Sequence, residues 1–343
     1  MSNQNRQITL AAHPEGAPKE TDFAMIETPV PRPKTGELLS RTIYLSLDPY
    51  MRGRMNRTLG YAKPTKLGEV MFGQTVSQVI ESTIDSYKPG DFILNWNGWQ
   101  DYAVSNGTGV RKLDPNGPPI STAVGVLGMP GLTAYVGLLD IGKPKAGETV
   151  VVSAASGAVG AIVGQIARLK GCRVVGIAGA REKCDYVTRE LGFDACVSRL
   201  DDTFLTDLKT ACPDGVDIYF ENAGGKVFQG VIPLLNNYGR VPVCGRIANY
   251  NLSEPPTGPD LVPRLMGLVL TRRLTMRGFI VWDHSDREAS FLDEVGSWIK
   301  NGELTYKEDI VDGLEHAIGA FQGLLHGKNF GKLLVRVSDD PTR

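Results

Sequence analysis

The sequence predicts an α/β protein with a doubly wound parallel sheet in its second half and a mostly β first half. Three observations predict this fold. The chain has 343 residues, enough for about two domains of roughly 150 residues each. Strand signals dominate residues 7–114, and from residue 126 onward strand and helix signals alternate. We therefore divide the chain into a first domain (1–125), a nucleotide-binding domain (126–305) and a C-terminal segment (306–343).

The first half contains short apolar runs that are typical of strands. The clearest are residues 38–45, 76–81 and 91–94, and clusters of Pro, Gly and Asp separate them. No long amphipathic helical pattern occurs in this half. It is therefore predicted to be a β domain with irregular loops.

The second half reads as a series of βαβ units. Residues 158–170 carry apolar residues at a helical spacing, and Gly171 follows as a stop signal. The expected strands are 149–154, 173–177, 195–197, 216–220 and 240–244, and a second helix is expected at 182–191. Such alternation predicts a parallel sheet that is covered on both faces. A helix at 314–325 and a last strand at 332–337 are expected to return to the first domain.

Composition excludes several classes of protein. Hydrophobic residues make up 42% and charged residues 22%, which suits a globular chain rather than a disordered one. The net charge of −1 shows no excess of positive charge of the kind that binds nucleic acid or an anionic membrane. No apolar run approaches the ~18 residues of a membrane helix, and the N-terminus lacks the apolar core of a signal peptide. A cytoplasmic protein is expected.

A phosphate-binding turn is predicted between the strand at 149–154 and the helix that follows it. The dinucleotide fingerprint G-x-G-x-x-G maps onto Ala155, Gly157 and Gly160, with alanine at the first position. Gly157 would allow the backbone to approach a pyrophosphate, and Gly160 would allow the helix to pack on the strand. The amino end of the helix would supply N–H groups for the phosphates. The alternative is an ordinary Gly-rich strand–helix turn.

The end of the second strand favours NADPH over NADH. An NAD site usually has an acidic residue here that binds the ribose hydroxyl, whereas residues 176–180 carry no carboxylate. Lys183 follows within one turn, and a cation suits a 2′-phosphate. The alternative for Lys183 is an exposed lysine on a helix surface, and the neighbouring Glu182 is expected to point to solvent.

No zinc or other metal site is predicted. Residues 1–171 contain no cysteine, and His13 is the only histidine there. Without a metal, a substrate carbonyl must be polarised by hydrogen bonds, and a protonated tyrosine hydroxyl can provide one. Hydride addition to a conjugated C=C bond then requires stabilisation of an enolate and a proton. The candidate side chains near likely loops are aromatic and basic: Tyr44, Tyr50, Arg52, Arg54, Trp96, Trp99, Tyr250 and Trp282.

Six motifs together carry a family resemblance that runs from about Ile8 to Val337. They are SLDPYMRGRM from Ser46, GWQDY from Gly98, GMPGLTAY from Gly128, AASGAVG from Ala154, YFENAGG from Tyr219 and GKNFGK from Gly327. The chain resembles the zinc-independent medium-chain dehydrogenase/reductases, in the branch of prostaglandin reductases and alkenal double-bond reductases. The resemblance implies a GroES-like first domain, a Rossmann domain that binds NADPH, a homodimer joined through the Rossmann sheet edges near 274–281, and an enone or enal substrate, with curcumin-like dienones among the candidates.

The same resemblance assigns the cofactor contacts. It places Ser156, Gly157, Ala158 and Val159 at the pyrophosphate turn, and Gly179 and Lys183 at the 2′-phosphate. Arg199 stands where relatives often have a tyrosine, which is a departure that would preserve or strengthen phosphate binding. The remaining contacts implied are Asn222, Cys244, Gly245, Tyr250, Phe279, Ile280, Val281 and Asn329.

Tyr50 and Tyr250 match the two tyrosines that flank the substrate in this family, and we assign both as catalytic candidates. The alternative for Tyr50 is a turn residue that packs its ring on the core, since it follows Asp48-Pro49. Arg52 and Arg54 are expected to be solvated surface arginines, with steering of an anionic ligand as their alternative. Trp282 adjoins the predicted nicotinamide segment.

The leading functional prediction is an NADPH-dependent oxidoreductase that reduces the C=C bond of α,β-unsaturated ketones or aldehydes. Two alternatives remain open at this stage. One is a quinone reductase of the same superfamily, and the other is a protein that binds NADPH without turnover.

Overall fold

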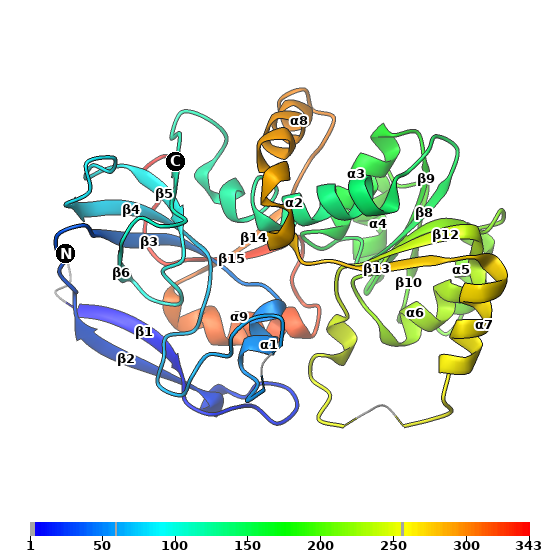
Figure 1. The fold of residues 1–343 in the computed structure, drawn as a ribbon, viewed down its shortest axis with the longest axis horizontal. Coiled ribbons are helices and arrows are strands. Elements are labelled where there is room, and N and C mark those ends of the chain that lie inside the picture. The colour runs from blue at the N-terminus through cyan, green and yellow to red at the C-terminus, as the bar shows by residue number, and fades with distance from the viewer. Residues whose placement is uncertain (1–3, 59, 255–256) are drawn as a thin grey trace. The chain divides into compact units, whose positions relative to one another are not determined.

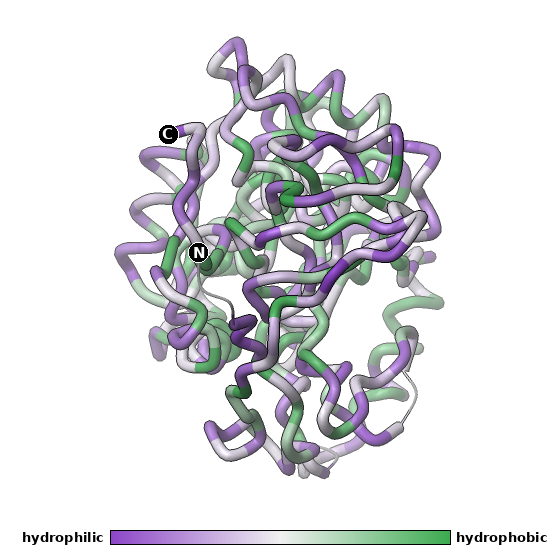
Figure 2. The backbone as a smooth tube through the Cα atoms, turned by 90° about the vertical axis from the view of Figure 1, so that its left-hand side faces the viewer, coloured by the Kyte–Doolittle hydropathy of each residue, from purple (hydrophilic) through white to green (hydrophobic). Residues whose placement is uncertain are grey.

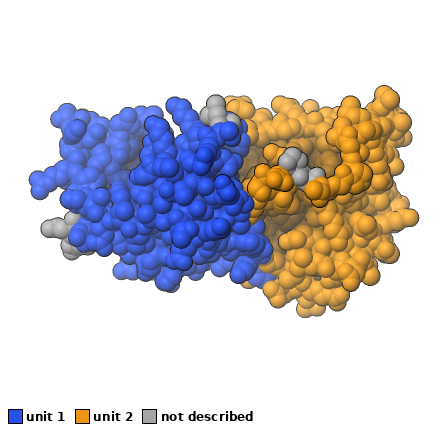
Figure 3. Space-filling view, turned by 90° about the horizontal axis from the view of Figure 1, so that it is seen from below, with its two compact units in different colours: residues 1–125, 308–343 blue, residues 126–307 orange. Residues whose placement is uncertain are grey.

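The computed structural model describes residues 4–58, 60–254 and 257–343, and the chain divides into two compact units. Unit 1 contains Met1–Gly125 and Glu308–Arg343, and unit 2 contains Val126–Lys307. Figure 3 shows unit 1 in blue and unit 2 in orange. No helix in the described part of the chain has both the length and the apolar composition needed to cross a membrane.

Unit 1 is built on a seven-stranded sheet in the order β14-β15-β3-β4-β5-β7, and β6 also pairs with β3. A separate antiparallel pair, β1 and β2, accompanies this sheet (Figure 1). The strands are β1 (Gln4–Leu10), β2 (Phe23–Pro29), β3 (Leu38–Ser46), β4 (Thr75–Ser82), β5 (Phe92–Asn95), β6 (Tyr102–Ser105), β7 (Arg111–Leu113), β14 (Glu308–Asp312) and β15 (Lys332–Arg336). The helices are α1 (Tyr50–Arg54) and α9 (Ala317–Leu325).

The C-terminal segment, Glu308–Arg343, belongs to unit 1. Strand β15 pairs antiparallel with β3, with Leu334 opposite Ser46. The fully buried ring of Trp99 stacks on Phe23, with 5.9 Å between ring centroids, and meets Phe321 of α9 edge-on. Trp99 is therefore a core residue of this unit.

Unit 2 contains a six-stranded sheet in the order β10-β9-β8-β11-β12-β13, and every neighbouring pair is parallel. The strands are β8 (Thr149–Ser153), β9 (Arg173–Ala178), β10 (Ala195–Ser198), β11 (Val216–Phe220), β12 (Leu235–Val243) and β13 (Thr275–Gly278). The helices are α2 (Met129–Val136), α3 (Gly160–Leu169), α4 (Arg181–Arg189), α5 (Phe204–Ala211), α6 (Gly225–Val231), α7 (Val262–Arg272) and α8 (Glu288–Lys300). Counted from β8, the order 3-2-1-4-5-6 is that of the Rossmann fold, which confirms the predicted fold class.

Both faces of this sheet are covered by apolar cores. In β8, Val150 and Val152 face the core that includes Ile162 and Ile166 of α3. Val151 points the other way, into the core that includes Phe204 of α5. Figure 2 colours the backbone by hydropathy, with hydrophobic residues in green and hydrophilic residues in purple. Because both faces of these strands are buried, their sequences are continuous apolar runs and do not alternate between apolar and polar residues.

The sequence reasoning missed α2 and the π-helical turn Gly137–Gly142 that extends it. Helix α2 is buried at every position except its first. A helix without a polar face produces no amphipathic period, so its pattern cannot be recognised. Gly137 follows directly, and a Cβ there would lie only 2.6 Å from the rings of both Phe220 and Phe279. A larger residue at position 137 would push these two rings apart.

Candidate functional site

The residues predicted for unit 2 gather at the carboxyl ends of the parallel strands. The chain order reverses between β8 and β11, which are neighbours in the sheet. Ligands of open α/β sheets bind at such a switch point, outside the carboxyl ends of the strands. Ser156–Val159 follow β8, Gly179 follows β9, Arg199 follows β10, Asn222 follows β11, and Cys244 follows β12.

The turn between β8 and α3 has the geometry of a phosphate-binding turn. A Cβ on Gly160 would lie 2.3 Å from the carbonyl oxygen of Ala154, so a side chain at position 160 would force the turn apart. The left-handed residue of the turn is Ala154, with φ of 52°. Ala155, which we matched to the first glycine of the fingerprint, is instead buried, and its methyl group lies 2.9 Å from the Cβ position of Gly176. Ala155 therefore serves in packing the turn on β9.

The outer side of this turn is open for a ligand. A Cβ built on Gly157 meets one atom within 4 Å, the carbonyl oxygen of Ala154 at 3.2 Å. Gly157, Ala158 and Val159 are half-buried, whereas the Ser156 side chain is buried. Helix α3 begins immediately after them and has ten residues, so its amino end directs N–H groups and a positive dipole to this place. The turn therefore fits a pyrophosphate group.

The end of β9 is bordered by two cations. Lys183 lies in the first turn of α4 and is 9% exposed, which contradicts the alternative of a surface lysine. Arg199 is exposed, and its guanidinium Nη2 lies 3.9 Å from the Cβ position of Gly179. Glu182 is exposed, as expected for a side chain that points to solvent. Two cations beside a glycine strand end fit a phosphate on the ribose 2′ position.

The end of β11 is fixed by a buried carboxylate that the sequence reasoning missed. Glu221 accepts hydrogen bonds from the Tyr219 hydroxyl at 2.9 Å, the Ser153 hydroxyl at 3.2 Å and the backbone N–H of Gly224 at 2.9 Å. Burial raises the pKa of the Glu221 carboxyl above its ordinary value. The only signal in the sequence is a carboxylate that directly follows an apolar strand run, VDIYF.

Asn222 ties β11 to β8. Its Nδ2 donates to the carbonyl oxygen of Ser153 at 2.8 Å, and its backbone N–H donates to the Ser153 hydroxyl at 2.8 Å. The carbonyl oxygen of Asn222 accepts from the N–H of Ile247 at 3.2 Å. Asn222 thus joins β8, β11 and the loop after β12 at the switch point.

The loop after β12 carries Cys244, Gly245 and Tyr250. Burial raises the pKa of the Cys244 thiol to about 12, so this thiol stays protonated at neutral pH. The Tyr250 hydroxyl lies 3.4 Å from the Cβ position of Gly245. Burial also raises the pKa of Tyr250, and a hydrogen bond from the backbone N–H of Arg246 opposes that rise. The raised pKa keeps the Tyr250 hydroxyl protonated at neutral pH.

The segment after β13 supplies apolar surface. Phe279 and Ile280 are half-buried and Val281 is buried. The Phe279 ring meets Phe220 edge-on, with 6.4 Å between centroids. Trp282 is 47% exposed and is therefore not a core residue.

Tyr50 and Asn329 belong to unit 1. Tyr50 is the first residue of α1, and its hydroxyl is buried without a hydrogen-bond partner among the described residues. Burial raises the pKa of this hydroxyl well above its ordinary value. The Asn329 side chain donates to the carbonyl oxygen of Gly331 at 2.8 Å. A buried hydroxyl without a partner is costly, so a ligand that accepts its proton would relieve a real penalty.

The turn before Tyr50 is held by a buried ion pair. The ammonium group of Lys332 in β15 donates to Asp48 Oδ1 at 2.8 Å and to the carbonyl oxygen of Leu47 at 2.9 Å. The side chains of Lys332 and Asp48 are only 5% and 6% exposed. Asp48 also accepts from the Ser46 hydroxyl. The C-terminal return strand therefore fixes the segment that positions Tyr50.

The expectation that Arg52 is a solvated surface arginine is wrong. Arg52 is 3% exposed, and its guanidinium donates to the carbonyl oxygen of Gly16 at 2.8 Å and to Asn56 Oδ1 at 2.6 Å. Arg54 is half-buried and stacks on the Phe72 ring, with 3.8 Å from its guanidinium carbon to the ring centroid. Arg52 therefore joins segments of unit 1, and nothing in the surrounding sequence, SLDPYMRGRM, indicated this.

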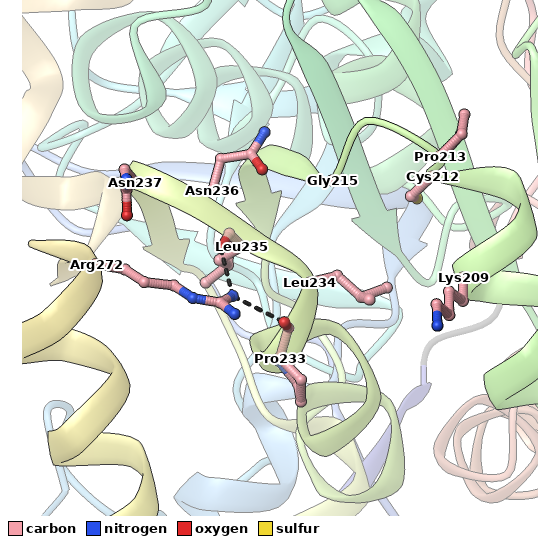
Figure 4. Close-up of a pocket in the computed structure, with 10 residues that line it drawn as sticks. All are labelled: Lys209, Cys212, Pro213, Gly215, Pro233, Leu234, Leu235, Asn236, Asn237 and Arg272. Atoms are coloured by element: carbon pink, nitrogen blue, oxygen red, sulfur yellow. Dashed lines mark hydrogen bonds between the residues drawn. The ribbon is translucent and has the colours of Figure 1, made fainter.

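A pocket of about 470 Å³ in unit 2 lies away from these residues (Figure 4). Its lining includes Gly215, immediately before β11, and Leu235, the first residue of β12. Arg272 donates to the carbonyl oxygens of Pro233 and Leu235, so its guanidinium group already has backbone partners. The pocket therefore opens at the amino ends of the strands, opposite the end where dinucleotides bind.

Comparisons with known proteins agree with this geometry. Residues 6–113 match the family model described as "N-terminal domain of oxidoreductase", and residues 158–297 match the one described as "Zinc-binding dehydrogenase". The chain is 52% identical to the NADPH-dependent curcumin reductase of Escherichia coli (strain K12), over 98% of each chain. The chain belongs to the medium-chain dehydrogenase/reductase family. This confirms the predicted membership, including the branch of prostaglandin and alkenal reductases.

Two further relatives support the same assignment. Prostaglandin reductase 1 of Rattus norvegicus is 42% identical, over 97% of this chain and 99% of its own length. The crystal structure of CurA in complex with NADPH from Vibrio vulnificus has a TM-score of 0.94 and 49% identity, covering 98% of this chain and 100% of that chain. For metals, the described residues include no group of three or more His, Cys, Asp or Glu side chains arranged to hold an ion.

Proposed function

We propose that the protein reduces the C=C bond of α,β-unsaturated ketones and aldehydes with NADPH. The observation that carries this proposal is full-length similarity to NADPH-dependent reductases, at 52% identity over 98% of the chain for the curcumin reductase. The site agrees with it, because two cations border a carboxylate-free strand end. The substrate range we propose includes curcumin-like dienones.

NADPH fits the residues at the carboxyl edge of unit 2. Ser156–Val159 would hold the pyrophosphate with the amino end of α3, and Gly179, Lys183 and Arg199 would hold the 2′-phosphate. Asn222, Cys244, Gly245 and Phe279–Val281 would border the nicotinamide half. Asn329 is proposed as a further cofactor contact. When bound, NADPH supplies the hydride that adds to the β carbon of the substrate.

Tyr250 is proposed as the donor to the substrate carbonyl. Its hydroxyl lies in the loop after β12, 3.4 Å from the Cβ position of Gly245, and its proton would bond the carbonyl oxygen. The raised pKa of Tyr250 keeps that proton in place at neutral pH. As the β carbon gains hydride, the C=C electron pair moves to the carbonyl oxygen, and a hydroxyl donor stabilises the enolate that forms. A proton then adds to the α carbon and completes the saturated ketone or aldehyde.

Tyr50 is proposed as a substrate contact. Its hydroxyl is buried and unsatisfied within the described structure, so a carbonyl or hydroxyl of the substrate would provide the missing partner. The Lys332–Asp48 pair fixes the preceding turn and thereby restricts where the ring can lie. We expect this residue to act mainly through substrate affinity.

The test is a substrate panel. Loss of absorbance at 340 nm is followed with NADPH and enones of increasing length, then with NADPH and quinones, and products are identified by mass spectrometry. The proposal expects enones to be converted to species heavier by two hydrogen atoms. Turnover of quinones without turnover of enones would assign the protein as a quinone reductase, and no turnover with either would favour the alternative of a binding protein.

We further propose a cytoplasmic homodimer joined through β13. This strand is an edge of the six-stranded sheet, and an unpaired edge invites pairing with another chain. Nearby on α7, Val262, Met266 and Leu270 are 60%, 59% and 77% exposed. A two-fold axis would pair the two edges and cover this apolar surface. Light scattering should give about twice the 37.2 kDa chain mass, and a mass of one chain at micromolar concentration would contradict the dimer.

A further inference from the structure

The carboxylate of Glu221 holds the turn that follows β11, at residues 222–224. Glu221 is 2% exposed. Its Oε1 atom accepts the backbone N–H of Gly224 at 2.9 Å and also the backbone N–H of Ala223. Its Oε2 atom accepts the Tyr219 hydroxyl at 2.9 Å. One carboxylate oxygen therefore serves the turn, and the other serves the core of the sheet.

Two backbone hydrogen bonds join this turn to the loop that contains Tyr250. The N–H of Ile247 donates to the carbonyl oxygen of Asn222 at 3.2 Å. The N–H of Ala248 donates to the carbonyl oxygen of Ala223 at 2.9 Å. Both donors belong to one 3₁₀ turn, which Tyr250 closes by donating its N–H to the carbonyl oxygen of Ile247 at 3.2 Å. The backbone of Tyr250 is thus tied to the turn that Glu221 holds.

The turn and the loop also pack closely against each other. Gly224 has φ of 75° and ψ of −162°, a conformation that is essentially restricted to glycine. A Cβ at this position would lie 2.5 Å from Asn249 Oδ1 and 3.2 Å from the Cβ of Arg246. The N–H groups of a buried turn need acceptors, and the Glu221 carboxylate supplies them. Without that carboxylate, the turn and the loop packed on it would relax together.

We propose that Glu221 is a positioning residue for Tyr250. Its carboxylate holds the turn at 222–224, and that turn holds the loop from which the Tyr250 hydroxyl would bond the substrate carbonyl. Glu221 is enclosed by its own hydrogen-bond donors, so it acts through the loop and not by contact with the substrate. The inference rests on the proposed role of Tyr250 in enone reduction and names the residue that keeps Tyr250 in place.

A double-mutant cycle on kcat, with NADPH and an enone at saturation, tests whether Glu221 acts through Tyr250. Glu221→Leu removes the acceptor and should lower kcat by about tenfold, because a displaced oxyanion donor contributes little. In the Tyr250→Phe background, Glu221→Leu should lower kcat by less than about threefold, because residues that act as a unit are not additive. Independent effects, which would multiply to about hundredfold in the double variant, would overturn the inference.

Two further variants separate the turn from the core. In Glu221→Gln the amide oxygen can still accept from the turn and the amide N–H can donate to the Tyr219 oxygen, so kcat should stay within about threefold of the unmodified protein. Tyr219→Phe removes the bond on Oε2 and leaves the bonds to the turn, so it should lower the melting temperature with little loss of kcat. Equal losses of kcat in Tyr219→Phe and Glu221→Leu would assign Glu221 to the stability of the core and would overturn the inference.

Hydrogen exchange measures how firmly the loop is held, without any activity assay. The N–H groups of Ile247, Ala248 and Tyr250 are all donors, so their exchange is slow while the loop is in place. Glu221→Leu should speed the exchange of a peptide that spans 246–252 by at least about threefold, whereas Glu221→Gln and Tyr219→Phe should not. Glu221→Asp should have the same effect as Glu221→Leu, because it keeps the charge and retracts the carboxylate from the turn. It serves as the test if Glu221→Leu does not fold, and unchanged exchange in the folded variants would overturn the inference.

These readouts separate the inference from the proposed function. Full turnover by Tyr250→Phe would refute the proposed role of Tyr250 and, with it, the effect of Glu221 on turnover. Faster exchange at 246–252 in Glu221→Leu or Glu221→Asp would still support positioning of the loop by the carboxylate, because exchange does not depend on enone reduction.

Discussion

Replacing Lys332 with methionine tests whether the C-terminal return strand fixes the turn that carries Tyr50. Methionine keeps an unbranched side chain and removes the ammonium group. Asp48 would then remain buried, and the Ser46 hydroxyl would be its one side-chain partner among the described residues. Removing one partner of a buried pair costs about 3–5 kcal/mol, because the other charge is left uncompensated. At roughly 2–4 °C per kcal/mol for a unit of this size, the melting temperature should fall by ~10 °C.

The assay is thermal and urea denaturation followed by circular dichroism. Arg336→Met is the matched control, because Arg336 lies on the same strand and its pair with Asp312 is exposed. We expect this control to melt close to the unmodified protein. Adding Asp48→Asn to Lys332→Met removes the unpaired charge and should recover about 1–2 kcal/mol. Equal melting temperatures for Lys332→Met and Arg336→Met would refute the reasoning.

Three further perturbations test the site. Lys183→Ala should raise the Michaelis constant for NADPH by about tenfold or more, because the variant loses a cation that would bind the 2′-phosphate. The Michaelis constant for NADH should barely change. Equal effects on the two Michaelis constants would contradict a role for Lys183 at the 2′-phosphate. Tyr250→Phe should lower turnover by at least about tenfold, which is less than the ~10²–10³ typical of a well-placed oxyanion donor. Tyr50→Phe should mainly raise the Michaelis constant for the substrate. Full turnover by Tyr250→Phe on several enones would contradict a catalytic role for Tyr250. Because the pKa of Glu221 is raised in the fold, the folded state binds its proton more tightly than the unfolded state, and stability from this group rises as pH falls from 7 toward its ordinary pKa of 4.5. As pH falls from 7 to 4.5, the unfolding free energy of the unmodified protein should therefore rise relative to that of Glu221→Gln. A difference between the two proteins that does not change with pH would contradict the raised pKa of Glu221.

The parts of the fold that the sequence predicted are those with a strong period or a short-range signal. Strands β8, β9 and β11 are buried on both faces, so they appear as uninterrupted apolar runs between turn residues. Helix α3 has an apolar stripe and a glycine stop, and it lies within the predicted range. Helix α2 was missed because a fully buried helix carries no polar face.

The site was less predictable because its determinants are contacts between distant segments. Lys332 and Asp48 are 284 positions apart, and nothing local to either residue indicates a buried pair. The same holds for the bonds from Arg52 to the carbonyl oxygens of Pro14 and Gly16, which depend on how unit 1 folds. Lys183 was identified by a local rule about strand ends, but its burial follows from the packing of α4 against the sheet.

The central claim is hydride addition to the β carbon of a conjugated carbonyl compound. It is tested most directly with NADPH that carries deuterium at the transferred position of its nicotinamide, mixed with a simple enone. Nuclear magnetic resonance of the product should show one deuterium at the β carbon of the saturated ketone, with the α carbon protonated from solvent. Deuterium on the carbonyl carbon, in an unsaturated alcohol, would contradict the account.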